Sequence, residues 1–258
     1  LGAAGQIMQR VTANPLASPE ILGVGTGAGV GLAVPLFLLA APGQLALLAG
    51  AMTGSTVVLA FMLVMSARGG FGPERLLLSG IAMGALCSAI LTAIIATGSP
   101  QAFLLLGWIS GSSAERLPGE AWMAWGALAI LVLPLTFTTR WLDILPLGRA
   151  MGVETGLPIY ASRVVLTVLA ACLTAIASLF VGPLSFIGLI APHIARLIGL
   201  HRPLAGLAGA MLIGAGLMTI SDWLARMVAF PYKLPLGLFA SLISGPYLIW
   251  LLSRGGRT

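Results

Sequence analysis

Long apolar runs, broken by single charged residues, dominate this sequence of 258 residues. Only 8% of the residues are charged and 59% are hydrophobic, and the mean hydropathy is +1.06. A soluble domain carries roughly 25% charged residues, so this chain cannot cover a core with a water-facing surface. The bilayer must be the solvent for most of the chain. At about 20 residues per span, there is room for eight or nine helices.

The sequence therefore predicts an all-α, polytopic transmembrane helix bundle that forms a single domain over residues 1–258. The chain begins in mid-helix without a methionine, so we interpret it as a fragment that starts within a span ending near residue 9. Residues 101–109 are too short to span and predict an interfacial or re-entrant helix. The remaining spans are expected at 20–40, 44–66, 75–97, 120–138, 160–181, 184–199, 203–226 and 234–252.

The single charges between the spans predict the orientation of the chain. If it leaves the cytoplasm near residue 20, ten arginines face one side: Arg10, Arg68, Arg75, Arg140, Arg149, Arg163, Arg196, Arg202, Arg254 and Arg257. Three cations face the other side: Arg116, Arg226 and Lys233. The positive-inside rule then places the C-terminus in the cytoplasm of a multi-pass inner-membrane protein. The predicted orientation depends on the short 184–199 segment being a span, because losing it would flip every earlier span relative to the C-terminus. The cations form no patch, which argues against nucleic acid.

Small residues recur at four-residue spacing within the expected spans. Such rows let helix backbones approach closely in lipid. The glycine-rich run near residue 25 also resembles a dinucleotide-binding loop, but no strand precedes it, so helix packing is favoured. The rows are Gly23–Gly27–Gly31, Gly25–Gly29, Gly80–Gly84 and Gly206–Ala210–Gly214.

Catalytic and cofactor motifs are absent from the sequence. There is no G-x-x-x-x-G-K-[ST] run, and the only lysine is Lys233, so the chain is not expected to bind ATP itself. His193 and His201 stand alone, and no cluster of cysteine and histidine predicts a metal site. Among the carboxylates, only Asp222 lies well inside an expected span, whereas ion-coupled transporters usually bury several. The sequence predicts neither an enzyme nor a bound cofactor.

Six stretches carry a resemblance to a known family: NPLASPEILGV (14–24), RLLLSGIAMG (75–84), LGWISGS (106–112), VGPLSFIGLIAPHIARLIG (181–199), SDWLARM (221–227) and LPLGLFASLISGPYLIWLL (234–252). Together they resemble the FecCD-type permeases, which are the membrane subunits of ATP-driven importers for iron-siderophores, haem and cobalamin. The resemblance runs along essentially the whole chain in the same order. It implies the type II importer fold of about ten helices per unit, with the first helix and part of the second missing here.

The resemblance also implies a transport function and a set of partners. The partners are a second permease unit, two cytoplasmic ATPase subunits that use ATP and a periplasmic siderophore-binding protein. The strings ASPEILG, WISGS and DW…RM…FP favour a permease for ferric hydroxamates, in the C-terminal half of a double-length chain. A haem or cobalamin permease of the same family stays open as an alternative, as does an ion-coupled secondary transporter.

Three sites follow from the resemblance. The cytoplasmic loop at about 139–159 is expected to contact the ATPase through Asp143, Leu147, Gly148, Arg149, Gly152 and Glu154. This loop has about three residues fewer than the family pattern. Arg226, beside Asp222, is expected to dock the binding protein, with a simple i,i+4 charge pair as the alternative. The candidates for the translocation pathway are Trp108, Ser110 and Ser185, although Trp108 could equally anchor the helix at the membrane interface. His193 is expected to be a packed, hydrogen-bonded residue.

Overall fold

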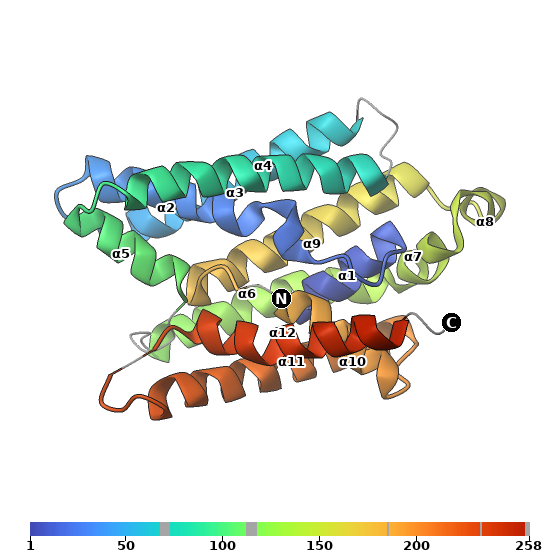
Figure 1. Cartoon of the computed structure of the whole chain (residues 1–258). Helices are drawn as coiled ribbons and strands as arrows, with labels where there is room; N and C mark the ends of the chain where they lie inside the picture. Colours follow the sequence, from blue (N-terminus) through green and yellow to red (C-terminus); the bar gives the residue numbers. More distant parts are fainter. Residues whose placement is uncertain (68–72, 112–117, 185, 233, 256–258) are drawn as a thin grey trace.

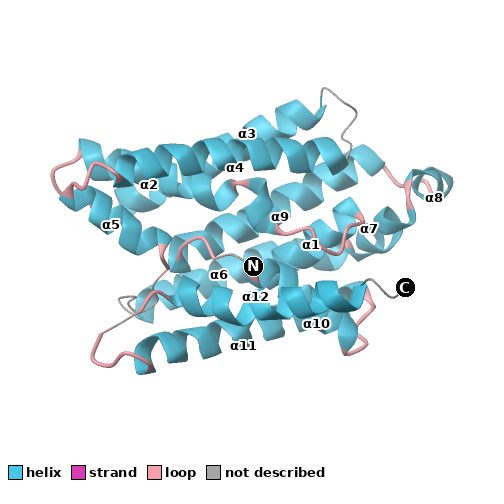
Figure 2. Cartoon of the chain, in the orientation of Figure 1, coloured by secondary structure: helices cyan, strands magenta, loops and turns pink. Residues whose placement is uncertain are grey.

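The computed structural model describes residues 1–67, 73–111, 118–184, 186–232 and 234–255, and every regular element in these ranges is a helix (Figure 2). This confirms the all-α bundle. The helices are α1 (Gly2–Thr12), η1 (Pro19–Leu22), α2 (Val24–Leu38), α3 (Gln44–Ala67), α4 (Pro73–Ile95), α5 (Pro100–Ile109), α6 (Pro118–Phe137), α7 (Thr139–Ile144), η2 (Leu145–Leu147), α8 (Arg149–Glu154), α9 (Ile159–Val181), α10 (Ile187–Leu197), α11 (Pro203–Met227) and α12 (Leu236–Gly255).

Four described helices, α3, α4, α9 and α11, are long and apolar enough to cross a membrane. A fifth candidate is α6, which bends by 65° into the segment Thr139–Leu147. The expected spans 44–66, 75–97, 160–181 and 203–226 therefore match helices closely. Among the described helices, full-length spans are nevertheless fewer than the eight or nine expected, because the other apolar helices are shorter or bent.

Two of the expected spans are interrupted. In the segment 20–40, a 3-10 helix ends at Leu22, Gly23 takes a left-handed conformation with φ +69°, and α2 begins only at Val24. In the segment 184–199, Phe186 has a φ of +71° and α10 contains only 11 residues. A helix of that length rises about 16 Å, roughly half of the ~30 Å hydrocarbon core. Helix α10 therefore occupies only part of the short span expected at 184–199.

The short α10 still returns the chain across the bundle. In Figure 1, α7 and α8 lie at one end, which we call the α8 end, and α5 lies near the other, the α5 end. Helix α9 runs from the α8 end to the α5 end, α10 leads back toward the α8 end, α11 crosses again, and α12 returns to the α8 end (Figure 1). Among the described arginines, Arg226 alone lies on a helix terminus at the α5 end. Arg116 and Lys233, the other two cations expected on that side, lie outside the described residues, so the predicted orientation stays a prediction.

The core is organised around α1, in which every residue except Arg10 is buried. Its side chains pack against α9, α10 and α11, and Ile7 and Met8 are fully buried. The glycine rows allow close helix contacts elsewhere. A Cβ added at Gly31 or at Gly54 would overlap backbone atoms of the facing helix, so α2 and α3 touch through their main chains. This confirms the helix-packing interpretation of the glycine-rich run.

Candidate functional site

An open groove of about 880 Å³ lies on the face of the bundle formed by α12, the end of α5 and the start of α2. Most of its lining comes from α12. The α12 positions in the lining recur every three or four residues, so they lie on one face of that helix. The α12 residues are Gly237, Leu238, Ser241, Leu242, Gly245, Pro246 and Ile249. The hydroxyl-bearing residues in the lining are Thr26, Ser110 and Ser241. The groove is therefore mainly apolar, with a few polar groups.

The three pathway candidates have different places in the structure. Ser110 lines the groove, and its carbonyl oxygen accepts a hydrogen bond of 3.2 Å from Gly237 N, which joins the end of α5 to the start of α12. Trp108 lies outside the groove lining and packs with the core cluster of α2 and α9, close to Gly29. Ser185 lies outside the described residues. Of the two candidates that the structure describes, Ser110 lies at the groove and Trp108 does not.

The expected coupling loop forms a small helical projection at the α8 end (Figure 1). Gly148, with φ +96°, separates η2 from α8, which begins at Arg149, and Gly152 packs against Ile159. Three apolar side chains here are largely exposed: Leu147 (61%), Met151 (44%) and Val153 (65%). Exposed apolar side chains among charged ones are typical of a protein contact surface.

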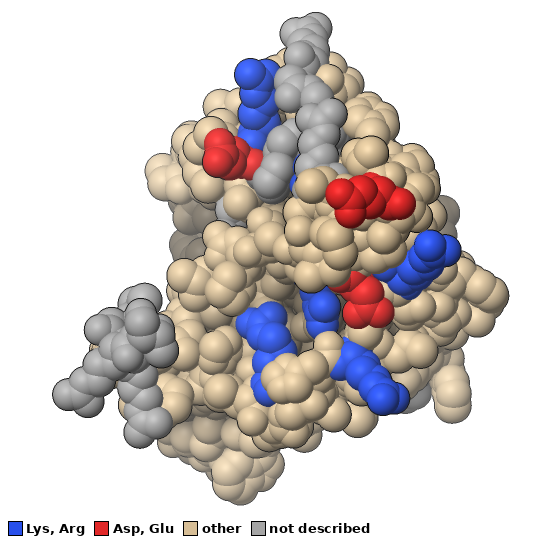
Figure 3. All heavy atoms as spheres, turned by 90° about the vertical axis from the view of Figure 1, so that its right-hand side faces the viewer, with Lys and Arg blue, Asp and Glu red and all other residues tan. Residues whose placement is uncertain are grey.

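Charged side chains gather on the surface at this end (Figure 3). Asp143 and Glu154, two of the coupling candidates, are exposed there. Arg140 donates a 3.5 Å hydrogen bond to the carbonyl oxygen of Thr155, which holds α7 to the end of α8. The described part of the loop therefore presents both charge and apolar surface outward.

At the α5 end, Arg226 and Asp222 form the i,i+4 pair that their spacing predicts. Arg226 Nε lies 2.8 Å from Asp222 Oδ2, and the side chains are 46% and 29% exposed. Both groups can therefore be reached from outside. The sequence did not indicate the neighbouring aromatic residues Phe230 and Tyr232, which are 80% and 77% exposed in the turn after α11.

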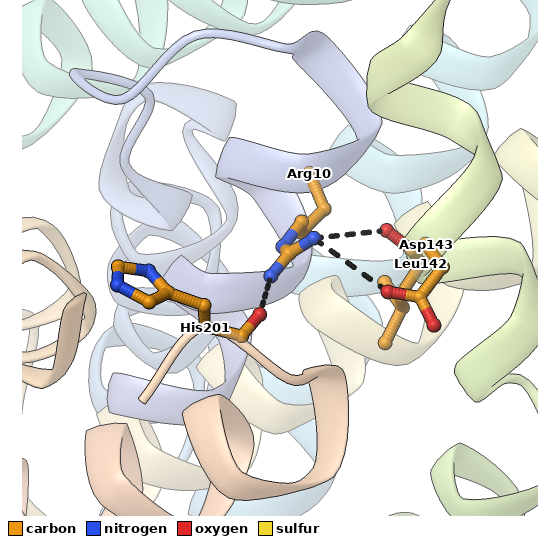
Figure 4. Close-up of polar contacts among 4 residues, drawn as sticks. All are labelled: Arg10, Leu142, Asp143 and His201. Carbon is orange, nitrogen blue, oxygen red and sulfur yellow. Dashed lines mark hydrogen bonds and ion pairs between the residues drawn. The ribbon is translucent and has the colours of Figure 1, made fainter. Parts of the chain in front are cut away.

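Arg10 has a structural role that the sequence did not indicate. Its guanidinium donates to the carbonyl oxygen of His201 at 2.7 Å and to that of Leu142 at 3.5 Å, and its Nη1 lies 4.0 Å from Asp143 Oδ1 (Figure 4). It thereby joins α1 to α7 and to the turn between α10 and α11. Because these partners are 132 and 191 residues away, no local spacing could reveal them.

A second missed residue is Glu20, in η1. Its Oε1 is buried without a hydrogen-bond partner in the described part of the chain, close to where a Cβ at Gly188 would lie. Asp222 is therefore not the only carboxylate within the bundle. No group of three or more His, Cys, Asp or Glu residues suited to a metal ion exists among the described residues.

Comparison with known proteins decides the family. The model of the FecCD transport family matches residues 1–254. The chain belongs to the FecCD transport family. Over 257 residues this FecCD chain is 40% identical to the iron(3+)-hydroxamate import system permease protein FhuB of Escherichia coli K12. It is 35% identical over 261 residues to the vitamin B12 import system permease protein BtuC of Escherichia coli O157:H7.

The two relatives differ in length. The whole FecCD chain aligns with each, but it spans only 39% of FhuB, against 79% of BtuC. A solved inward-facing structure assigned to the metal-chelate type of ABC transporter superposes with a TM-score of 0.91 at 22% identity, covering 98% of this chain and 81% of that one. PsaBC from Streptococcus pneumoniae gives a TM-score of 0.64 at 13% identity, covering 96% of this chain and 84% of that one. These two likenesses concern the fold alone.

Proposed function

We propose that this chain is a membrane-spanning permease unit of an ATP-binding cassette importer that carries an iron(III)-siderophore of the hydroxamate type from periplasm to cytoplasm. The observation that supports it is the 40% identity to FhuB along the whole chain. The 35% identity to BtuC makes cobalamin the main alternative cargo within the same mechanism.

The groove supports a pathway between two units. One wall of it is α12, and the other side is open, so a second permease unit, in a separate chain or in the same longer chain, completes the channel. A mainly apolar lining with a few hydroxyls offers weak contacts. Passage requires such weak binding, because a cargo that is held tightly does not leave.

The α8 end supports contact with a cytoplasmic ATPase. These 258 residues contain no nucleotide-binding loop, and in the proposed importer a separate subunit hydrolyses ATP. The exposed apolar and charged side chains of α7 to α8 suit that contact, and the arginines at this end favour a cytoplasmic location. The α5 end then faces the periplasm, where the binding protein arrives.

Cargo class can be tested by uptake into cells that lack their own chelate permeases and express the complete permease with its ATPase and binding protein. The probes are a ferric hydroxamate, a ferric catecholate, haem and cobalamin, supplied one at a time. We expect uptake of the hydroxamate alone. Uptake of cobalamin without hydroxamate would reject the proposed cargo and leave the permease function standing.

A cysteine at Ser241 should crosslink two units across the groove. Ser241 lines the groove on α12, whereas Ile130 on α6 is 71% exposed outside the groove lining. Oxidation should join units that carry Ser241→Cys and leave Ile130→Cys units separate, as seen by native mass measurement in detergent. The opposite pattern would place the unit interface on another face.

Arg226→Glu should weaken association with the binding protein. Exposed charge pairs contribute about 0.2–1 kcal/mol, and reversal adds repulsion to that loss. Rim charges act mainly on association rate and salt dependence, so the residual affinity should also become less sensitive to salt. Surface binding at several salt concentrations measures both effects.

Asp222→Asn is the matched control for Arg226→Glu. It removes the ion-pair partner and keeps the docking cation, so binding should stay near the wild-type level. If both variants lower the amount of folded permease and neither changes binding, Arg226 has only a structural role.

A further inference from the structure

A row of residues leads from the α8 end through the interior of the bundle to α12, the main wall of the groove, through hydrogen bonds, the chain neighbours Arg10 and Gln9 on α1, and a final ring contact. Its first member is Arg10, which holds the carbonyl oxygens of Leu142 and His201 and lies beside Asp143 (Figure 4). Arg10 side-chain exposure is only 18%, so these contacts are largely shielded. A displacement of α7 therefore acts directly on α1.

Gln9 is the second member and joins α1 to α10. Its side chain is 4% exposed. Oε1 accepts a hydrogen bond of 2.6 Å from Arg196 Nη1, and Nε2 donates one of 3.1 Å to the carbonyl oxygen of Leu189. The oxygen and the nitrogen of the Gln9 amide are thus both hydrogen-bonded to residues of α10. Since α10 is only 11 residues long, these bonds fix much of its position on α1.

His193 and Tyr247 complete the row. Arg196 Nη2 lies 3.4 Å from His193 Nδ1, and the His193 ring meets the Tyr247 ring edge-on at 6.0 Å. Tyr247 follows Pro246, a lining residue of the groove. A proline inside a helix removes a backbone hydrogen bond, so α12 lacks one intrahelical bond next to the point where the row reaches it.

The contact between His193 and Tyr247 is suited to change. His193 Nε2 and Tyr247 Oη are buried and have no hydrogen-bond partner within the described ranges. A shift of α12 against α10 therefore breaks no hydrogen bond at these two atoms. The row is hydrogen-bonded at its α8 end, whereas at α12 the contact between His193 and Tyr247 is one of ring packing.

We propose that Arg10, Gln9, Arg196, His193 and Tyr247 are positioning residues that transmit movement of the ATPase-facing segment to the groove wall on α12. The proposal rests on the proposed importer function. Contacts in series do not by themselves establish energetic coupling, so the test must measure how much transport each ATP supports.

Two buried glutamines on one helix give a matched pair of variants. Gln6 is 1% exposed, and neither of its amide atoms has a hydrogen-bond partner in the described structure. Gln9→Met and Gln6→Met both replace a buried amide on α1 with an apolar chain of similar size. Only Gln9→Met removes the acceptor of Arg196 and the donor to α10.

The measurement is cargo taken up per ATP hydrolysed, in proteoliposomes that contain the complete permease, its ATPase and its binding protein. The cargo probe is a ferric hydroxamate, or the chelate found in the uptake test. We expect Gln9→Met to lower this ratio by roughly 2- to 30-fold and Gln6→Met to leave it near wild type. Gln9→Glu retains an acceptor for Arg196 and should restore most of the ratio.

Tyr247→Leu gives an independent variant, because it removes the ring contact with His193 without removing a hydrogen bond made by Oη. We expect it to lower the ratio while the amount of folded complex stays unchanged. Wild-type ratios in both Gln9→Met and Tyr247→Leu would overturn the proposed row of positioning residues. Absence of ATP-dependent uptake in the wild-type assembly would instead overturn the importer function on which it rests.

Discussion

Replacing residues 147–154 with a Gly/Ser linker of equal length is expected to abolish ATP-driven uptake while the bundle stays folded. The exchange removes the exposed apolar surface of Leu147, Met151 and Val153. The flanking residues must be kept, because Leu145 and Leu157 are buried in the core cluster around α1. The loop expected at 139–159 is therefore partly core and partly exposed surface.

The readouts for this exchange are binding-protein-stimulated ATP hydrolysis and uptake, with size-exclusion chromatography to show a folded complex. A Gly/Ser exchange of residues 39–43, an exposed loop at the α5 end, is the control and should preserve coupling through the ATPase. Normal uptake after exchange of 147–154 would show that the ATPase contacts another part of the chain.

Gly5→Ala should strongly reduce the amount of folded protein. A Cβ at Gly5 would overlap the carbonyl oxygen and α-carbon of Gly188, so α1 and α10 would have to separate. No rotamer change relieves a clash with backbone. Overpacking of this kind costs about 1–3 kcal/mol or more, which outweighs the ~1 kcal/mol by which Ala is preferred to Gly within a helix.

The matched control is Gly216→Ala on α11, where an added Cβ would meet nothing within 4 Å. We expect its thermal midpoint in detergent to equal or slightly exceed that of the wild type, and the midpoint of Gly5→Ala to fall by several degrees or to be lost with the folded yield. Equal midpoints for the two variants would contradict the close α1–α10 contact.

Hydropathy predicts the long spans well because lipid cannot satisfy an open backbone. Helices such as α3, α9 and α11 must therefore be continuous where the sequence is continuously apolar. The same signal fails at Gly23 and Phe186, where the backbone turns left-handed inside an apolar run. Gly23 is buried against the backbone of α4, where the protein supplies contacts that lipid cannot, whereas Phe186 is 38% exposed. Composition reveals neither break.

Site residues could be predicted from local spacing and from family motifs, but not from long-range packing. The four-residue spacing of Asp222 and Arg226 indicated their ion pair, and the family resemblance indicated Ser110. By contrast, the bond between Gln9 and Arg196 joins residues 187 positions apart. Only the fold brings such polar groups together, because each of them looks like an isolated polar residue in an apolar run.

The central claim, that this chain forms the membrane unit of an ATP-driven importer, is tested most directly by initial uptake of a ferric hydroxamate into proteoliposomes. The complete permease, the ATPase, the binding protein and ATP are each omitted in turn, and an ionophore is added in a parallel series. We expect uptake only with all four components, and we expect the ionophore to leave it unchanged. Uptake by the permease alone that the ionophore abolishes would contradict it and identify an ion-coupled secondary transporter.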